Sequence, residues 1–227
     1  EKIKEFAQQT SAENILVTYV PKKTDMSTSL DYFVVKGTDH LKETFLEKEF
    51  EFHAQGFFQN NTSMAGEMQK YINKILKQYD TKKSYLLDLY GGVGTFGIIN
   101  SDLFSKVTIV EFSKEAIDSA KVNIKNNNIT NAEALVLDAK QIKKLQIEPD
   151  FIITDPPRSG MHNNTIEYIN AIKPKLIIYI SCNPQQLKKE LPRFKDYTIN
   201  SAAIFDLFPQ TPHSEAIVEL KLNNPST

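Results

Sequence analysis

The stretch SYLLDLYGGVGTFG, residues 84–97, decides the fold. Its apolar first half predicts a buried β-strand, and its second half predicts a glycine-rich turn. From this point on, the chain alternates short apolar runs with helix-like segments. Strands that alternate with helices are typical of a parallel β-sheet with helices on both faces. We therefore predict an α/β fold for most of the chain.

The apolar runs that follow predict further strands and helices in the same way. We expect strands at residues 106–112, 132–139, 150–157 and 175–182, and a closing β-pair at residues 197–208 and 215–222. We expect helices at residues 63–79, 113–128, 165–172 and 184–191. Ser113 is predicted to be an N-cap, because its side chain can accept a hydrogen bond from a free backbone N–H.

The first 50 residues have a different pattern. Residues 13–52 predict short antiparallel strands and turns, and the segment FFQNN, residues 57–61, leads from them into the first predicted helix. We expect residues 1–56 to form a small N-terminal α+β subdomain, itself part of a central domain. Residues 57–227 are then a second domain that contains the parallel sheet.

Composition excludes several classes of protein. The chain has 227 residues, of which 41% are hydrophobic and 24% charged, which is typical of a globular protein. A single cysteine cannot form an internal disulfide, no apolar run reaches the ~20 residues that span a bilayer, and the N-terminus lacks a signal pattern. We therefore expect a cytoplasmic protein with no membrane partner. A net charge of −1 predicts no general attraction to nucleic acid, although lysine-rich stretches leave local RNA contacts open.

Polar residues gather where the predicted strands end. Asp88 and the glycines follow the first strand, and four more residues follow the next four strands: Glu111, Asp138, Asp155 and Cys182. Ligands of such sheets bind at the carboxyl ends of the strands. Five strand ends of this kind indicate an active site in one crevice.

The glycine turn indicates a nucleotide-like cofactor. Gly92, Gly94 and Gly97 match the spacing G-x-G-x-x-G, so a nicotinamide-dependent enzyme is one candidate. Glu111 lies where a carboxylate can accept hydrogen bonds from both ribose hydroxyls, and Asp138 is placed to contact an adenine amino group. Hydride transfer, however, gives no role to the segment DPPRSG, residues 155–160, or to Cys182. A methyl-transfer reaction explains both.

Six segments together resemble the RNA uracil-C5 methyltransferase family, which uses S-adenosylmethionine. They are FFQNN (57–61), LDLYGGVGTFGI (87–98), VEFSKEAIDSAKVN (110–123), DPPRSGMH (155–162), YISCNPQQLKKEL (179–191) and DLFPQTPHSEAIVEL (206–220). The resemblance extends over roughly residues 45–222, and the last three segments are the most specific. It implies a Rossmann-like class I methyltransferase fold, with residues 57–227 as the catalytic domain.

The chemistry of uracil methylation requires a nucleophile and a base. A thiolate that adds to carbon 6 makes carbon 5 nucleophilic, and a base must later remove the proton from carbon 5. By resemblance, Cys182 is the nucleophile and Glu215 is the general base. His213 is a competitor for the role of base, because the ordinary pKa of histidine suits proton transfer near neutral pH. Asp155 is expected to hold the uracil edge or the methionine end of the cofactor.

The resemblance also implies binding residues. Gln59 would contact both the cofactor and the base, and Tyr90, Glu111 and, with weaker support, Thr95 match cofactor-binding positions. Arg158 is a candidate for a phosphate or a structural carboxylate. Phe57 and Phe58 could stack on RNA bases, although core packing is the preferred explanation for both. The target uridine must leave its stack to reach Cys182, so we expect a loop of tRNA or rRNA as the partner.

The chain departs from the family pattern in three respects. Some relatives bind an iron–sulfur cluster through four cysteines, and with one cysteine this chain is expected to bind none. Some carry an N-terminal RNA-binding β-barrel, of which the sequence shows no sign. We expect either a compact member of the family or a fragment of a longer protein, and the first residue, glutamate, favours the fragment. We expect a monomer.

Two other functions remain open. An amino-methyltransferase of RNA, DNA or protein would use the segment Asp155-Pro156-Pro157 and would need neither Cys182 nor Glu215. A catalytically idle RNA-binding fragment would bind RNA but leave Cys182 unreactive.

Overall fold

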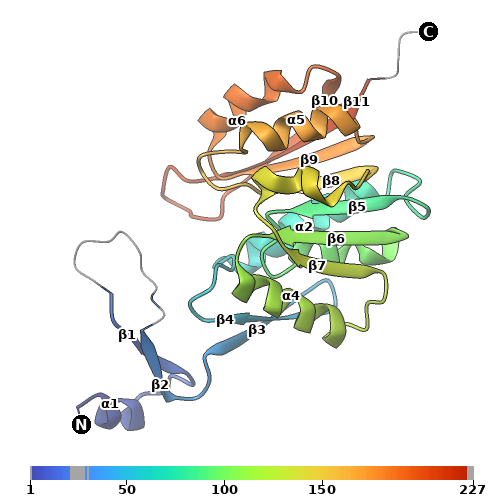
Figure 1. Cartoon of the computed structure of the whole chain (residues 1–227). Coiled ribbons are helices and arrows are strands. Elements are labelled where there is room, and N and C mark those ends of the chain that lie inside the picture. The colour runs from blue at the N-terminus through green and yellow to red at the C-terminus, as the bar shows by residue number, and fades with distance from the viewer. Residues whose placement is uncertain (1, 21–28, 30, 224–227) are drawn as a thin grey trace.

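The computed structural model describes residues 2–20, 29 and 31–223, and it is built around one seven-stranded β-sheet (Figure 1). The strands lie in the order β10-β11-β9-β8-β5-β6-β7. They are β5 (Tyr85–Leu89), β6 (Lys106–Glu111), β7 (Ala132–Val136), β8 (Phe151–Thr154), β9 (Leu176–Ser181), β10 (Tyr197–Phe205) and β11 (Glu215–Leu222). The five strands β5 to β9 are parallel, whereas β11 runs antiparallel to both of its neighbours. The predicted parallel sheet and its closing β-pair are confirmed.

Helices cover both faces of this sheet. They are α2 (Thr62–Leu76), α3 (Thr95–Ile99), α4 (Lys114–Asn126), α5 (Asn163–Ile172) and α6 (Pro184–Glu190), with short 3-10 helices η1 (Ser101–Leu103), η2 (Ala139–Leu145) and η3 (Leu191–Arg193). The predicted N-cap is confirmed, because Oγ of Ser113 accepts a hydrogen bond from the N–H of Ala116, 3.2 Å away. Buried side chains of α2, α3 and α4 form one core cluster, and those of α5, η2 and α6 form another.

Strand residues alternate between these two clusters, as the two-residue period of a β-strand requires. In β9, Ile178 and Ile180 pack on the side of α2, whereas Ile177 and Tyr179 pack on the side of α5. The same alternation holds in the other central strands. We call the two surfaces of the sheet the α2 face and the α5 face.

The N-terminal region contains a helix and two pairs of strands, as expected of an α+β region, although the helix was not located from the sequence. It consists of α1 (Lys2–Gln9), the antiparallel pair β1 (Ile15–Thr18) and β2 (Tyr32–Lys36), and the antiparallel pair β3 (His40–Phe45) and β4 (Lys48–His53). The helix α1 is exposed apart from Ala7, and although Ile3, Phe6 and Ala7 have helical spacing, eight residues are too short a stretch for that pattern to identify a helix. Residues 21–28 and 30 of the predicted strand region lie outside the described part of the chain.

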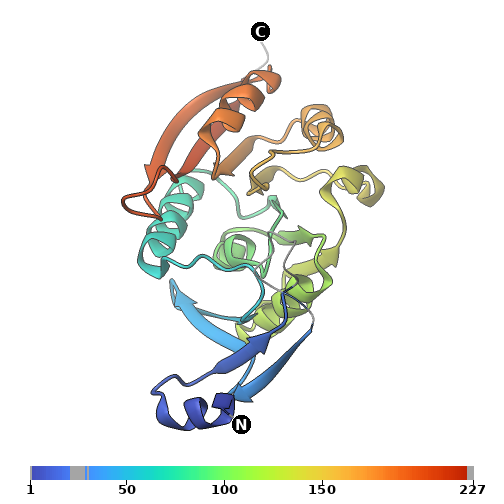
Figure 2. The same ribbon diagram turned by 90° about the vertical axis from the view of Figure 1, so that its left-hand side faces the viewer.

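The two N-terminal pairs of strands have different surroundings. The pair β1–β2 lies with α1 at the end of the molecule opposite to β10 and β11 in both views (Figures 1 and 2). The pair β3–β4, in contrast, buries Phe45 and Phe50 in the cluster on the α2 face. The division of the chain at residue 56 stays a prediction, but β3–β4 shares the core of the sheet.

Candidate functional site

A cavity of about 1200 Å³ lies at the carboxyl ends of the parallel strands. We call it the large cavity. Ten of the residues predicted from the sequence line it: Gln59, Tyr90, Gly92, Glu111, Asp138, Asp155, Arg158, Cys182, His213 and Glu215. A smaller cavity of about 60 Å³, which we call the small cavity, adjoins it and is lined by Thr95 and Phe58 among others. Gly94 lines neither cavity.

The glycine turn between β5 and α3 forms one wall of both cavities. Gly94 is the N-cap of α3 with φ of +88°, a left-handed conformation that glycine adopts without steric cost. Gly92 also has a positive φ, and a Cβ atom added there would meet no atom within 4 Å. Its backbone therefore faces open space and can be approached closely by a ligand, whereas Gly94 shapes the turn.

Asp88 does not lie in the crevice, contrary to the prediction. It is part of β5, only 1% exposed, and its Oδ2 accepts a hydrogen bond from the N–H of Gly97, 2.8 Å away. Burial raises the pKa of Asp88 to about 7. The residue therefore supports the glycine turn from below rather than contacting a ligand.

Glu111 ends β6 and lines the large cavity, where its carboxylate is fixed by backbone groups. Its Oε1 accepts hydrogen bonds from the N–H groups of Phe112, at 2.8 Å, and Ser113, at 3.0 Å, and its Oε2 lies 3.4 Å from the N–H of Gly92. The side chain thus links the end of β6 to the glycine turn. A carboxylate held in this way is preorganised for a diol such as a ribose.

Asp138 lies beyond the end of its strand rather than at it. The strand β7 ends at Val136, and Asp138 is the N-cap of η2. Its Oδ1 accepts a hydrogen bond from the N–H of Lys140, and its Oδ2 forms an ion pair with Nζ of the same lysine at 2.7 Å. Partial exposure leaves this carboxylate able to accept a further hydrogen bond.

Cys182 and Glu215 lie across from each other on neighbouring strands. In the antiparallel register of β9 and β11, Ala216 pairs with Ser181 and Ile217 with Ile180. One step further along this register, Glu215 lies opposite Cys182. The alternation of the strands also assigns both residues, together with Asp155 after β8, to the α2 face of the sheet.

Electrostatics link these three groups. Burial raises the pKa of Glu215 to about 7, the charge of Asp155 raises it further, and Arg158 opposes the shift. Burial likewise raises the pKa of Asp155 to about 7. The pKa of the Cys182 thiol is raised by burial, which is the largest cause, and by the charges of Glu215 and Asp155. The thiol is therefore neutral in the free protein. Glu215 is 6% exposed, and its Oε2 has no hydrogen-bond partner among the described residues.

The loop after β8, which carries Asp155 and Arg158, is tied to α6. Nδ2 of Asn183 donates a hydrogen bond to the backbone oxygen of Arg158 at 3.0 Å. Glu190, only 2% exposed, accepts hydrogen bonds from the Tyr179 hydroxyl and from the N–H of Met161 at 3.3 Å. Because α6 begins directly after Cys182, the loop and the cysteine are held by one helix.

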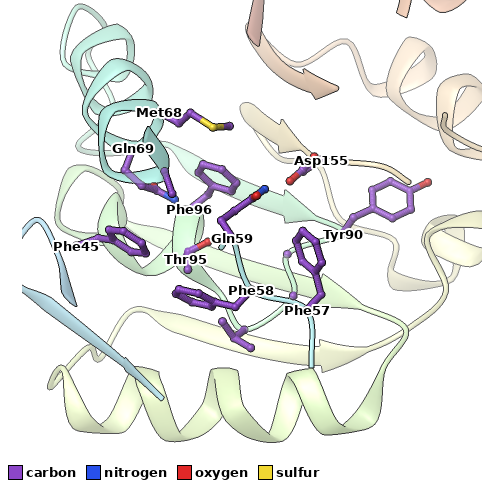
Figure 3. A pocket seen from close by; sticks show the side chains of 14 residues that line it. Phe45, Phe57, Phe58, Gln59, Met68, Gln69, Tyr90, Thr95, Phe96 and Asp155 are labelled. Carbon is purple, nitrogen blue, oxygen red and sulfur yellow. The ribbon is translucent and has the colours of Figure 1, made fainter. Parts of the chain in front are cut away.

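The segment that carries Gln59 enters the site from the core. Figure 3 shows Gln59 between Gln69, which extends from α2, and Asp155 and Tyr90 on the opposite side of the small cavity. Phe58 does not offer a free stacking surface, contrary to its predicted role in binding the substrate. Its ring stacks on Phe52 with centroids 3.9 Å apart and on Phe45 at 5.7 Å. Core packing explains Phe58.

Several residues of the site were not predicted from the sequence. They include Phe112, which is 73% exposed, Phe208 and His53 of β4, all of which line the large cavity. Phe57, one of the two residues predicted to stack on bases, lines it as well and is 76% exposed. Gln69 had a signal that could have revealed it. It occupies a buried position of α2 in the spacing of Ala65, Met68 and Ile72, where an apolar residue is expected.

His213 and Arg158 complete the rim of the large cavity. His213 is exposed, and its ring meets Phe208 edge to face with centroids 6.4 Å apart. Its backbone N–H, rather than its ring, forms the local hydrogen bond, which goes to Oγ1 of Thr211. Arg158 is exposed and influences the pKa of both Cys182 and Glu215. In the part of the chain that the structure describes, no helix has the length and apolarity to cross a membrane.

Comparison with known proteins identifies similar sequences and structures. A family model described as tRNA (Uracil-5-)-methyltransferase matches residues 1–223. An uncharacterized RNA methyltransferase of Nanoarchaeum equitans is 36% identical over 198 residues, covering 87% of this chain and 43% of the relative. A 23S rRNA (uracil(747)-C(5))-methyltransferase of Xenorhabdus nematophila is 32% identical, covering 84% and 50% respectively. The chain thus spans about half the length of these curated relatives.

Solved structures extend the comparison. A Pyrococcus abyssi tRNA (uracil-54, C5)-methyltransferase in complex with S-adenosyl-L-homocysteine superposes with a TM-score of 0.78 at 27% identity, covering 94% of this chain and 52% of that one. The Pyrococcus abyssi protein Trm5b superposes with a TM-score of 0.64 at 12% identity, over 93% of this chain and 64% of that one, and shows the fold alone.

Proposed function

The chain belongs to the tRNA (uracil-5-)-methyltransferase family, and from this membership we propose that it methylates carbon 5 of a uridine in RNA, with Cys182 as nucleophile and Glu215 as general base. The observation that carries the proposal is the pairing of β9 with β11, which brings these two residues opposite each other beside one cavity. Neither residue belongs to the hydrophobic clusters formed by the described residues.

The large cavity fits S-adenosylmethionine. Glu111 offers a fixed carboxylate to the ribose hydroxyls, Asp138 an acceptor to the adenine amino group, and the backbone at Gly92 a surface free of side chains. Tyr90, Gln59 and Asp155 continue this lining toward Cys182. When bound, the cofactor supplies the methyl group in an activated, electrophilic form.

The protein groups account for the remaining chemistry. The thiolate of Cys182 forms a bond to carbon 6 of uracil, and the electron pair of the double bond between carbons 5 and 6 moves toward carbon 5. Once carbon 5 carries the new methyl group, the Glu215 carboxylate removes the proton there. The electrons of that C–H bond restore the double bond, the bond between sulfur and carbon 6 breaks, and the thiolate leaves.

The raised pKa values fit these roles. A carboxyl group with a pKa of about 7 is a stronger base than an ordinary glutamate and is still half ionised at neutral pH. The Cys182 thiol, in contrast, has to lose its proton before it attacks, because burial and the two carboxylates favour its neutral form. We propose that Asp155 accepts this proton when the substrate is bound, which leaves the Glu215 carboxylate free for the proton on carbon 5.

Trapping tests the proposal. We would incubate the protein and its Cys182→Ala variant with S-adenosylmethionine and RNA that contains 5-fluorouridine. Fluorine cannot leave carbon 5 as a cation, so the reaction should stop at a covalent complex of protein and RNA. We expect that complex with the wild type, a cross-linked peptide that contains Cys182, and no complex with the variant.

Other outcomes favour the other candidate functions. Methyl transfer to RNA that persists in Cys182→Ala would support an amino-methyltransferase that uses the Asp155-Pro156-Pro157 segment. RNA binding without turnover or adduct would support an idle binding fragment. Sequencing the trapped RNA distinguishes a tRNA loop from an rRNA loop. The similar proteins leave this choice open, because the Xenorhabdus nematophila relative is named for 23S rRNA and the Pyrococcus abyssi structure for tRNA.

A further inference from the structure

The small cavity is lined by a buried side-chain amide, that of Gln69. Gln69 is 3% exposed, and its Oε1 has no hydrogen-bond partner among the described residues. A buried amide without a partner lowers stability, and the neighbouring buried positions of α2 are filled by apolar residues such as Met68 and Ile72. A glutamine at this position therefore costs the free protein stability without an evident structural benefit.

The small cavity is an extension of the proposed cofactor site. It shares Gln59, Tyr90, Gly92 and Asp155 with the large cavity. Its other polar residues are Gln69 and Thr95, and most of the remaining wall is apolar or aromatic. Figure 3 shows Gln69 approaching from α2 on the side opposite to Asp155 and Tyr90. The polar groups thus converge from several elements on a space adjoining the glycine turn.

We propose that Gln69 is a specificity-determining residue that hydrogen-bonds the amino-acid end of S-adenosylmethionine in the small cavity. This inference rests on the proposed function. The sulfur of that cofactor carries three groups: the adenosyl group, which Glu111 and Asp138 would hold, the methyl group, which must face carbon 5 of the uracil held by Cys182, and the amino-acid arm. The small cavity adjoins the large cavity at Tyr90, Gly92 and Asp155, so it can receive the third of these groups. An ammonium group on that arm would donate to Oε1 of Gln69, the atom that the protein leaves without a donor.

Binding of two ligands that differ only at this end tests the inference. We would measure S-adenosylhomocysteine and 5′-methylthioadenosine, which lacks the amino-acid part, by titration calorimetry. The variants are Gln69→Leu and the similarly shaped Gln69→Met. The matched control is Ile72→Val, one turn along the same buried stripe and outside the lining of both cavities. Thermal unfolding of the free protein is recorded for every variant.

We expect both Gln69 variants to bind S-adenosylhomocysteine about tenfold more weakly, equivalent to ~1.4 kcal/mol. Their affinity for 5′-methylthioadenosine should change less than about twofold, and their melting temperature should stay the same or rise because the unpaired amide is gone. Ile72→Val should leave the ratio of the two affinities unchanged.

The inference is overturned if Gln69→Leu and Gln69→Met weaken the binding of both ligands by the same factor, or if they weaken the binding of neither ligand. A merely structural role would give the first of these results together with a lower melting temperature. If the wild type binds 5′-methylthioadenosine but not S-adenosylhomocysteine, the assignment of the small cavity fails while the adenosine site stands. If it binds neither, the proposed function itself fails.

Discussion

Glu215 combines burial, a raised pKa and an oxygen without a partner among the described residues, and each property has a consequence for catalysis. Burial leaves the carboxyl group half protonated near neutral pH, so the fraction able to accept a proton falls as the pH falls below about 7. The same group can therefore limit the final step of the proposed reaction even when the earlier steps proceed.

Glu215→Gln should stall the reaction after methyl transfer. Glutamine cannot accept the proton from carbon 5, so we expect product release to fall by about 10²–10⁴-fold while a methylated covalent complex accumulates. Denaturing gels with labelled RNA and labelled methyl groups measure both the released product and the methylated covalent complex. In the wild type, the rate of product release should decrease about tenfold per pH unit below about pH 6.

Glu219→Gln is the matched control for that variant. Glu219 is also buried in β11, but it accepts hydrogen bonds from Tyr79, Asn200 and Ser201 and does not line the large cavity. We expect it to lower stability without accumulation of an adduct. Accumulation in both variants, or in neither, would contradict the assignment of Glu215.

At the scale of elements, α4 anchors both β4 and the glycine turn through one side chain. Asn123 is fully buried, its Oδ1 accepts from the N–H of Glu51, and its Nδ2 donates to the backbone oxygens of Glu51 and Val93. Because these bonds lie in the protein interior, breaking them leaves backbone groups unpaired.

We expect Asn123→Ala to lower the free energy of unfolding by about 2–4 kcal/mol, and to weaken binding of S-adenosylhomocysteine through the displaced glycine turn. Urea unfolding and calorimetry measure the two effects. The exposed Asn126→Ala, three residues along the same helix, should change the unfolding free energy by less than ~0.7 kcal/mol, in line with its helix propensity. Equal effects of the two substitutions would show that Asn123 is not an anchor.

The helix α6 holds the Asp155–Met161 loop through Glu190 in a similar way. Glu190→Ala should lower the rate of methylation by about 10–100-fold, because small displacements of reacting groups have effects of that size. Glu190→Gln keeps the acceptor for Tyr179 and should restore most of the rate, whereas the exposed Lys189→Ala should have no effect on it. A loss of rate in Glu190→Ala that Glu190→Gln does not improve would exclude positioning by these hydrogen bonds.

At the scale of the whole molecule, three carboxyl groups among the described residues have a pKa raised to about 7, namely Asp88, Asp155 and Glu215. In the unfolded chain these groups titrate near pH 4, so between about pH 4 and 7 the folded protein binds more protons than the unfolded one. The free energy of unfolding should therefore fall as the pH rises through this window.

We expect the ligand-free protein to be more stable at pH 5.5 than at pH 8 by about 1–3 kcal/mol, measured by urea unfolding. Asp88→Asn should reduce this difference, because that residue is the most deeply buried of the three and does not line the cavities. Stability that rises with pH over this range would contradict the raised pKa values.

Much of this architecture was predictable from the sequence because it depends on local patterns. The apolar runs identified all seven strands of the central sheet, and Ser113 marked the start of α4. Residues at strand ends, such as Cys182 and Asp155, were predicted to meet because parallel strands end at one edge of a sheet.

The sequence was less informative where the outcome depends on partners far along the chain. Asp88 matched the pattern of a strand end, but whether a carboxylate faces a ligand or the N–H of Gly97 depends on the turn that follows it. Phe57 and Phe58 are chemically identical neighbours, and only the position of Phe52 across the core decides which ring is buried. The helix α1 has apolar residues at helical spacing, but its eight residues are too few for that pattern to distinguish a helix.

The strand β11 is the last described element of the chain, yet it lies in the sheet between β9 and β10 rather than at an edge. During synthesis on the ribosome, Cys182 therefore emerges well before the strand that brings Glu215 to it. A nascent chain that has folded as far as β9 would expose its thiol without its base. We expect such a chain to be catalytically silent, so that methylation begins only when the final strand has inserted.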